Sequence, residues 1–251
     1  MFKRKELKYL PSRIWQTISL LARSHKIFRG KYIWKAHELK FADQFKELAP
    51  LLIKEFLTAH PNFTGLKAET VNNPNGDVHL AVGGDKWKVV AFRYIHKWML
   101  EPNFEKDYPT AIQMIKMLEK YCPIAEYSIL EPGGEITVHN GIENRYSEYL
   151  RYHIPLIIPE EGIDKLGFEC MGELIDWSDV WAFDNQGMHT AWNRTDKHRL
   201  IFIIDIHRSV AGVPPSDIPH IKDKDIETAI YLLIRNIRWW WYNITGKNKN
   251  A

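Results

Sequence analysis

Two histidines and an arginine in the second half of the chain have the types and spacing of an iron site with an anion clamp. His139 and His189 stand 50 residues apart among alternating apolar residues, and Arg199 follows the second histidine by ten positions. Neutral imidazoles are good ligands for ferrous iron, and a guanidinium matches a carboxylate through two parallel hydrogen bonds. If these three side chains converge, we expect an oxygenase.

Arg199 carries a second signal, because it opens the apolar run LeuIlePheIleIle. A charge in a buried strand is costly unless a partner of opposite sign compensates it. That partner is either a neighbouring Asp or Glu, or the distal carboxylate of 2-oxoglutarate, an acidic co-substrate of non-haem iron oxygenases. The residues alone leave both partners open.

The residues between 126 and 208 predict the scaffold that must position these groups. Short runs of strand-forming residues recur at regular spacing, separated by turn sequences such as ProGlyGly and AspAsnGlnGly and by no helical crossover. Such spacing predicts a β-sandwich or a jelly roll, and we expect a jelly-roll (double-stranded β-helix) core with the two histidines at strand ends beside loops. The expected strands cover residues 126–130, 135–139, 149–158, 180–183, 188–192 and 199–206.

Helices are expected to flank this mainly β core. Apolar residues recur at helical intervals over 41–60, where Pro50 could interrupt the helix, and a further helix is expected over 110–121. We divide the chain into a basic amino-terminal arm (1–40), a single jelly-roll domain with supporting helices (41–208), and a carboxy-terminal helix with a basic Trp-rich tail (209–251).

Positive charge is concentrated near the amino terminus. Residues 1–40 hold 11 Lys or Arg against two acids, net +9, so the other 211 residues carry net −6 within a total of +3. A total this small does not support nucleic-acid binding as a main function. Near the amino terminus the one short apolar stretch is too brief for a membrane span and lacks the cleavage pattern of a signal peptide, so we expect a cytoplasmic protein.

The end of the chain has two interpretations. TrpTrpTrpTyr occupies residues 239–242, and the last 17 residues hold four basic residues and no acid. The tail either packs as a helix against the core or, together with the basic arm, makes peripheral contact with the inner face of a membrane.

Two cysteines, Cys122 and Cys170, lack metal-type spacing and are expected to be reduced, buried thiols.

Three ordered motifs make the segment from Glu126 to Arg208 resemble the aspartyl/asparaginyl β-hydroxylase family of iron(II)- and 2-oxoglutarate-dependent dioxygenases. They are TyrSerIleLeuGluProGlyGlyGluIleThrValHisAsnGly, ArgTyrHisIleProLeuIleIlePro, and AlaPheAspAsnGlnGlyMetHisThrAlaTrpAsn followed by HisArgLeuIlePheIleIleAspIleHis. The strong resemblance covers 83 of the 251 residues, with a weaker continuation back to Trp87. The family also includes hydroxylases of lipid A and of ornithine-lipid acyl chains.

The resemblance implies a cofactor and a co-substrate, iron(II) and 2-oxoglutarate, and residues that hold them. His139 and His189 look like the iron ligands. Arg199 and Ser128 look like the pair that holds the distal carboxylate of 2-oxoglutarate, and His153 resembles the residue near its other carboxylate.

Three further residues are carried over to the substrate side of the site. Arg151 lies two positions before His153, hence on the same strand face, and resembles a residue that faces the co-substrate or the substrate. Trp87 looks like a pocket tryptophan, and Arg145 is a further candidate for the substrate pocket.

The third iron position departs from the general oxygenase pattern. Most such enzymes place a carboxylate two residues after the first histidine, and here that residue is Gly141. The same replacement is typical of the resembled family, which implies two protein ligands with water in the vacant place. Glu143 is the nearest carboxylate that could substitute. The 11 residues between His139 and Arg151 are longer than is usual in the family, so the substrate is not assigned by analogy.

These features predict a hydroxylase that oxidises an unactivated C–H bond. The expected substrate is an Asp- or Asn-type side chain of an amino acid or peptide, for which Arg145, Arg151 and His153 would supply the cations. The alternative is the acyl chain of a membrane lipid, favoured by the basic arm and the Trp-rich tail. A second alternative is a non-catalytic β-sandwich that binds a ligand or partner and whose histidines are structural.

Overall fold

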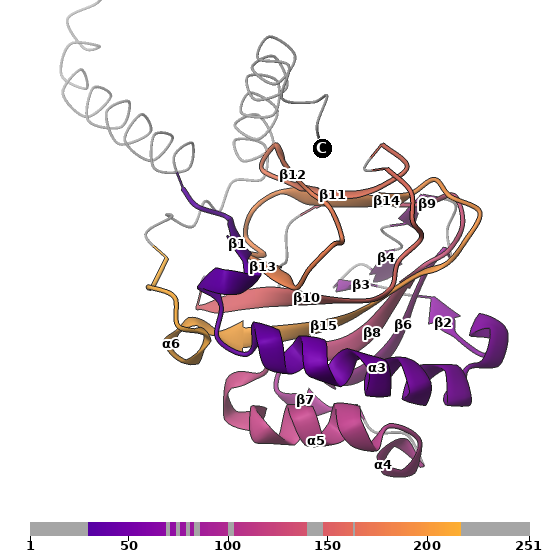
Figure 1. The fold of residues 1–251 in the computed structure, drawn as a ribbon, viewed down its shortest axis with the longest axis horizontal. Coiled ribbons are helices and arrows are strands. Elements are labelled where there is room, and N and C mark those ends of the chain that lie inside the picture. Colours follow the sequence, from indigo (N-terminus) through magenta and orange to yellow (C-terminus); the bar gives the residue numbers. More distant parts are fainter. Residues whose placement is uncertain are drawn as a thin grey trace, which may run out of the picture.

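Two facing β-sheets, with helices against the outer face of the larger one, make up the fold of the computed structural model (Figure 1). The structure describes residues 30–68, 71–73, 76–78, 81–82, 86–99, 103–139, 148–162 and 164–216. This arrangement is a jelly roll with supporting helices, so the predicted fold class is confirmed.

The larger sheet has eight strands in the order β1-β13-β10-β15-β8-β6-β2, with β7 paired to β6. Its strands are β1 (Ile33–Lys35), β2 (Lys67–Ala68), β6 (Trp87–Tyr94), β7 (Lys97–Trp98), β8 (Ala125–Leu130), β10 (Tyr149–Ile157), β13 (Trp181–Phe183) and β15 (Arg199–His207). The smaller sheet, in the order β12-β11-β14-β9-β5, contains β5 (Ala81–Val82), β9 (Gly134–His139), β11 (Leu166–Cys170), β12 (Glu173–Ile175) and β14 (His189–Asn193). A separate hairpin pairs β3 (Val71–Asn73) with β4 (Gly76–Val78).

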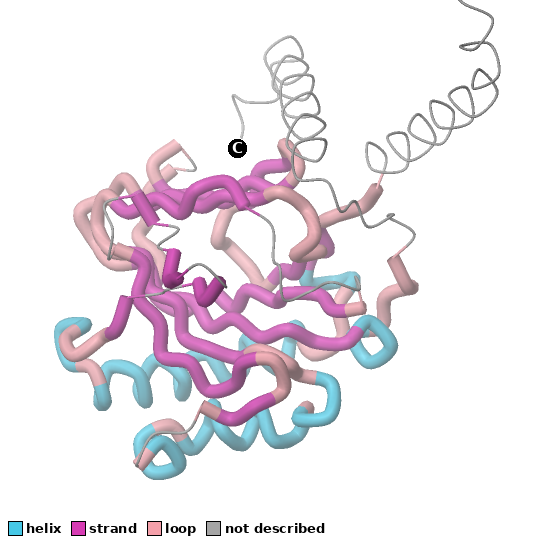
Figure 2. Tube along the Cα trace, turned by 180° about the vertical axis from the view of Figure 1, so that it is seen from behind, coloured by secondary structure: helices cyan, strands magenta, loops and turns pink. Residues whose placement is uncertain are grey.

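The helices gather on one side of the molecule, beneath the larger sheet in both views (Figures 1 and 2). They are α3 (Ala42–Ala59), α4 (Phe104–Asp107), α5 (Pro109–Met117) and α6 (Arg208–Ala211), with 3-10 turns at Ala36–Glu38, Pro61–Phe63 and Glu119–Tyr121. α3 runs through Pro50 without interruption, and the proline lies on its exposed face. Among the described helices none combines the length and apolarity needed to cross a bilayer.

Alternation along the central strands gives the larger sheet two different faces. Even-numbered residues of β10 and β15, such as Tyr152 and Phe202, pack in the core between the larger sheet and the helices. Odd-numbered residues, such as Ile201 and Ile203, pack instead with residues of the smaller sheet, Phe168 among them. Because side chains alternate with a period of two, one set of strands builds both the supporting core and the interior of the jelly roll.

The six predicted strands correspond to β8, β9, β10, β13, β14 and β15, each within one residue at either end. β11 and β12 were not predicted. β11 reads LeuGlyPheGluCys; its apolar residues alternate, but it is short and contains a glycine, a residue that is unfavourable in strands. β1 begins the sheet inside the region assigned to the basic arm. The remainder of that arm, 1–29, and residues 217–251 with the Trp-rich tail lie outside the described residues.

Both cysteines are free and buried, as predicted. Burial raises the pKa of the Cys122 thiol far above its ordinary value, which keeps the sulfur protonated. Neither residue forms a disulfide, in agreement with the reduced state expected from the sequence.

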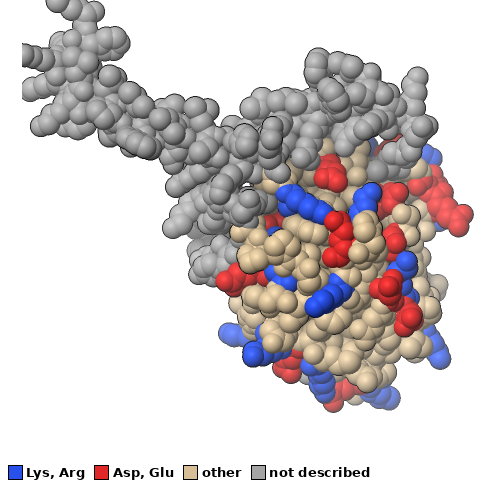
Figure 3. Space-filling view, turned by 60° about the vertical axis from the view of Figure 1, so that its left-hand side comes forward, with Lys and Arg blue, Asp and Glu red and all other residues tan. Residues whose placement is uncertain are grey.

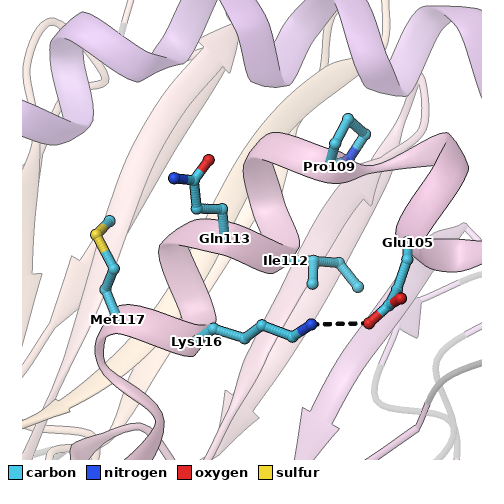
Figure 4. Close-up of a pocket in the computed structure, with 6 residues that line it drawn as sticks. All are labelled: Glu105, Pro109, Ile112, Gln113, Lys116 and Met117. Atoms are coloured by element: carbon cyan, nitrogen blue, oxygen red, sulfur yellow. Dashed lines mark hydrogen bonds and ion pairs between the residues drawn. The ribbon is translucent and has the colours of Figure 1, made fainter.

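The described surface carries charges of both signs. The face seen in Figure 3 intersperses blue Lys and Arg with red Asp and Glu. On the helical side an open groove along α5 includes Glu105 and Lys116, whose Nζ donates to Glu105 Oε1 at 2.8 Å (Figure 4). Such an exposed pair contributes little to stability, because solvent screens it and both side chains lose freedom.

A buried ion pair joins β13 to the end of the domain. Asp184, which follows β13, is fully buried and accepts a hydrogen bond from Arg208 of α6 at 2.6 Å. Its carboxylate also accepts hydrogen bonds from the backbone N–H of Gln186 at 3.0 Å and from the hydroxyl of Ser216 at 3.3 Å. The Arg208 guanidinium carbon lies 4.9 Å from the ring centroid of Trp34, which is part of β1. This pair therefore ties the β1–β13 edge to the carboxyl end of the sheet.

Removal of the buried carboxylate is expected to destabilise the domain far more than removal of a surface one. Asp184→Ala leaves Arg208 buried without its anion and should lower the free energy of unfolding by about 3 kcal/mol. The matched control Glu105→Gln, which breaks the exposed pair with Lys116, should change it by less than about 0.5 kcal/mol. Urea unfolding of the three proteins measures both values, and equal losses would contradict the structural role of the buried pair.

Candidate active site

The ends of β9 and β14 bring together the two predicted iron ligands. β9 ends at His139 and β14 begins at His189, and the two residues are directly opposite in the antiparallel register. Their ring centroids are 4.2 Å apart, with the ring planes at 55°. Residues that are distant in sequence therefore present two adjacent imidazoles at one end of the smaller sheet.

Both imidazoles have the same tautomer. His139 Nδ1 donates to the carbonyl of Thr137 at 2.7 Å, and His189 Nδ1 donates to the carbonyl of Gly187 at 2.8 Å. Because a carbonyl can only accept, Nδ1 carries a hydrogen in each ring, and Nε2 is the nitrogen without one when the ring is neutral. Burial, and then the neighbouring His139, hold the pKa of His189 well below its ordinary value. The geometry therefore favours the neutral, Nε2-presenting state that a metal requires.

Gly187 allows the chain to pass close to its neighbours just before His189. A side chain at Gly187 would place its Cβ 2.7 Å from Tyr32 Cδ1 and 2.8 Å from Cys170 Sγ. Only glycine fits this close contact without displacing its neighbours. The same residue supplies the carbonyl that orients His189, so the AspAsnGlnGly turn positions the ligand as well as starting the strand.

Arg199 is a buried cation without a carboxylate partner among the described residues. It is 1% exposed, and its Nε and Nη1 atoms have no hydrogen-bond partner. Burial alone lowers the pKa of the guanidinium to about 9. Of the two partners left open by the sequence, a neighbouring Asp or Glu is therefore not found in the described structure. The unpaired fork is available for the carboxylate of a bound molecule.

Ser128 and Trp87 complete the surroundings of this guanidinium. Ser128 Oγ accepts hydrogen bonds from Arg199 Nη2 at 3.3 Å and from Trp87 Nε1 at 2.9 Å. A hydroxyl that accepts from two donors keeps its own hydrogen to donate. The cross-strand register on β15, β8 and β6 aligns these side chains on the same sheet face. Ser128 can thus add one donor to those of Arg199.

Arg151 occupies the same cavity but is neutralised. Its Nε and Nη2 atoms donate to the two oxygens of Asp205 at 2.8 and 3.0 Å, and Asp205 is 1% exposed. The two residues are directly opposite in the β10–β15 register. Arg151 lines the cavity as expected from the sequence, but Asp205 holds two of its N–H donors. Asp205 was missed, although a carboxylate inside the run IleIleAspIle is itself a signal of a buried pair.

His153 is buried among aromatic rings. Its ring centroid is 4.4 Å from that of Trp181 and 5.6 Å from that of Trp177, and its Nδ1 has no partner. Burial first, then the charges of Arg199 and Arg151, lower its pKa well below the ordinary value. His153 is thus a neutral ring on the wall of the cavity.

One cavity collects nearly all of the predicted site residues. It is lined by Trp87, Ser128, His139, Arg151, His153, His189 and Arg199, together with Ile136, Phe168, Phe183, Ala191, Ile201 and Ile203. Within the part of the chain that the structure describes, no group of three or more His, Cys, Asp or Glu is placed to hold a metal. Gly141, Glu143 and Arg145 belong to residues 140–147, outside that part.

The two arginines of the cavity should respond in opposite directions to the same substitution. Because the pKa of Arg199 is lower in the folded protein, the unfolded chain binds its proton more tightly, and the charge costs stability at every pH below about 9. Arg199→Met without ligand should therefore raise the free energy of unfolding at pH 7 by about 1–3 kcal/mol.

Arg151→Met is the matched comparison. It should lower the free energy of unfolding by about 2–4 kcal/mol, because Asp205 is left buried without its cation. Urea unfolding at pH 7 measures both variants. Changes of the same sign would show that Arg199 has a compensating charge after all.

Comparisons with known proteins show the family to which this chain belongs. The model of the aspartyl/asparaginyl beta-hydroxylase family matches residues 52–209. An ornithine lipid ester-linked acyl 2-hydroxylase from Rhizobium tropici is 39% identical over 83 residues, which are 32% of this chain and 28% of that protein. The aspartyl/asparaginyl beta-hydroxylase of Mus musculus is 36% identical over 83 residues, 32% of this chain and 10% of that protein.

The match thus spans less than a third of the length of either relative. Among solved structures, a prolyl hydroxylase from Trichoplax adhaerens in complex with a hypoxia inducible factor peptide has a TM-score of 0.45 and 11% identity, over 78% of this chain and 93% of that one. The family match covers well over half of the chain and includes every site residue from Trp87 to Arg199. The chain belongs to the aspartyl/asparaginyl β-hydroxylase family.

Proposed function

We propose that the protein is a hydroxylase that depends on iron(II) and 2-oxoglutarate. The observation that carries this proposal is the content of one cavity: two adjacent imidazoles that each use Nδ1 to contact a backbone carbonyl, and a buried guanidinium whose Nε and Nη1 have no partner among the described residues. A two-histidine metal site and a carboxylate clamp are the two parts that such an enzyme requires. Family membership supports the same assignment.

The residues present fit both groups. His139 and His189 would hold the iron, and Arg199 with Ser128 would hold the distal carboxylate of 2-oxoglutarate. When bound, these groups supply the oxidising power that hydroxylates an unactivated C–H bond. The protein's own contribution is to orient the imidazoles through Thr137 and Gly187 and to fix one end of the co-substrate.

The cavity wall also limits access of water. Its apolar residues come from both sheets and include Ile136 and Phe168 of the smaller sheet and Ile201 and Ile203 of the larger one. A dry wall strengthens the interaction between Arg199 and a carboxylate, since water no longer screens it. It also keeps competing water away from the reacting carbon.

The non-catalytic sandwich is the less favoured function. It requires that Arg199 and the histidines be satisfied by the protein itself. Arg199 lacks such a partner in the described residues, and a purely structural buried cation without one costs stability for no gain. The same cost is explained if the guanidinium is kept for a ligand.

Binding of iron(II) and 2-oxoglutarate gives a direct test. Anaerobic titration should produce the weak visible charge-transfer band of the ternary complex, and His189→Ala should abolish it because one of two ligands is lost. Arg199→Ala should weaken 2-oxoglutarate binding by about 100-fold, the loss of a charge-assisted pair. Glu143→Gln is the control and should keep the band.

No band in the wild-type protein would favour the non-catalytic sandwich. Succinate production that is unchanged in Arg199→Ala would remove Arg199 from its assigned role. Loss of the band in Glu143→Gln would make that carboxylate the third ligand.

For the substrate we propose an Asp- or Asn-type side chain of a peptide or amino acid. Arg151 and Trp87 line the cavity beside the two histidines, so this part of the wall contains polar groups. The Mus musculus relative carries the name aspartyl/asparaginyl beta-hydroxylase, which supports this class.

A membrane-lipid acyl chain is the second candidate, and a specific observation favours it. Asp205 neutralises Arg151, so Arg199 is the one uncompensated arginine among the described cavity residues, and the rest of the wall is largely apolar. An uncharged chain suits such a wall. The Rhizobium tropici relative is named as an acyl 2-hydroxylase. Peripheral membrane contact through the basic arm and the Trp-rich tail would belong to this candidate.

A substrate panel separates the two classes. Asp- and Asn-containing peptides are expected to stimulate succinate formation and to gain one oxygen atom by mass spectrometry. Stimulation by anionic vesicles of acylated lipid, with peptides inactive, would instead select the acyl chain. In that case a form ending at Ile226, which lacks residues 239–242, should sediment less with the vesicles.

A further inference from the structure

Trp177 is buried beside Arg199 although it belongs to neither sheet. It lies between β12 and β13 and is 4% exposed. The guanidinium carbon of Arg199 lies over the indole, 4.9 Å from the ring centroid. His153 stacks against the same ring, with 5.6 Å between centroids and an angle of 12° between planes. One side chain thus contacts two residues assigned to the co-substrate.

The connection that carries Trp177 is anchored on both sides. Asp176 accepts hydrogen bonds from the backbone N–H and the hydroxyl of Ser178, at 3.1 and 2.7 Å. Asp179 forms an ion pair with Lys46 of α3 at 3.0 Å. Trp181 packs against the indole, with 5.4 Å between ring centroids. These contacts with neighbouring residues fix the path of the connection and pack the indole against Trp181, while its Nε1 has no hydrogen-bond partner among the described residues.

The indole is suited to support a cation that has no anion. The face of an aromatic ring carries partial negative charge and attracts a guanidinium, more strongly where water is absent. The N–H donors of a guanidinium lie in its plane, so a contact over the guanidinium carbon leaves its edges open. Nη2 of Arg199 donates to Ser128 Oγ, and Nε and Nη1 have no hydrogen-bond partner among the described residues.

We propose that Trp177 is a positioning residue for the carboxylate clamp, which holds the Arg199 guanidinium in the orientation that receives the distal carboxylate. This inference rests on the proposed function and deepens it. Trp177 acts through Arg199 and has no assigned contact with iron or substrate. The sequence does not reveal this role, because a tryptophan in a connection carries no mark of the strand residue that it contacts.

Two ligands that differ only at the distal end provide the test. The affinity of the manganese(II)-loaded protein for 2-oxoglutarate is compared with its affinity for 2-oxopentanoate, which has a methyl group in place of the distal carboxylate. Trp177→Leu and Trp177→Met remove the aromatic face and should raise the Kd for 2-oxoglutarate by roughly 5- to 30-fold, with the Kd for 2-oxopentanoate unchanged within about twofold. Trp177→Phe keeps a ring face and should stay within about threefold of wild type.

The chain offers a matched control. Arg93 lies over the ring of Trp98 at 5.0 Å, but Glu119 already neutralises this arginine at 3.0 Å. Trp98→Leu therefore removes a similar contact outside the cavity and should leave both affinities unchanged. Isothermal titration calorimetry measures all of these values without turnover.

The outcomes separate the inference from the function on which it rests. If the wild-type protein binds no 2-oxoglutarate, the proposed function fails. If it binds and the folded Leu or Met variant binds equally well, the positioning role of Trp177 is wrong. Equal losses for both ligands would assign Trp177 to packing of the cavity and would overturn the proposal as well.

Discussion

A guanidinium that is buried without a carboxylate partner among the described residues is the constraint on which the interior of this protein depends. Arg199 is almost fully buried, and burial alone lowers its pKa to about 9, which reports an uncompensated charge. Ser128 and Trp177 give it partial support through a hydroxyl oxygen and a ring face. Stability by itself would favour an apolar residue there. The cost of the charge is understandable if the site is kept ready for an anionic ligand.

The two arginines of the cavity differ in whether a carboxylate of the described protein pairs with them. Arg151 meets Asp205 directly across the β10–β15 pair, and the ion pair is buried and complete. Arg199 is opposite Leu130 and receives no such partner in the described residues. A carboxylate that enters the cavity therefore finds its strongest attraction at Arg199, since the charge of Arg151 is already neutralised.

The two faces of the larger sheet divide support from chemistry. The face that the helices cover is filled by apolar and aromatic side chains such as Tyr152 and Phe202. The opposite face presents the charged and hydroxyl groups of the site toward the smaller sheet, which supplies the two histidines. Because one face is packed as an ordinary core, the other can hold costly polar groups without loss of the fold. The histidines need only local support, and each obtains it from the carbonyl two residues before it.

Much of this could be predicted from the sequence because it depends on local pattern. Alternation and turn residues identify six strands, the types and spacing of His139, His189 and Arg199 point to the candidate site, and the family resemblance adds Ser128. Three features could not be found in this way. β11 and β12 are short and β11 contains a glycine, Asp205 meets Arg151 only through the cross-strand register, and Trp177 reaches Arg199 from a connection. Register and loop packing are set by contacts between segments distant in the chain, so the sequence determined which groups are present and the tertiary structure decided which of their charges are neutralised.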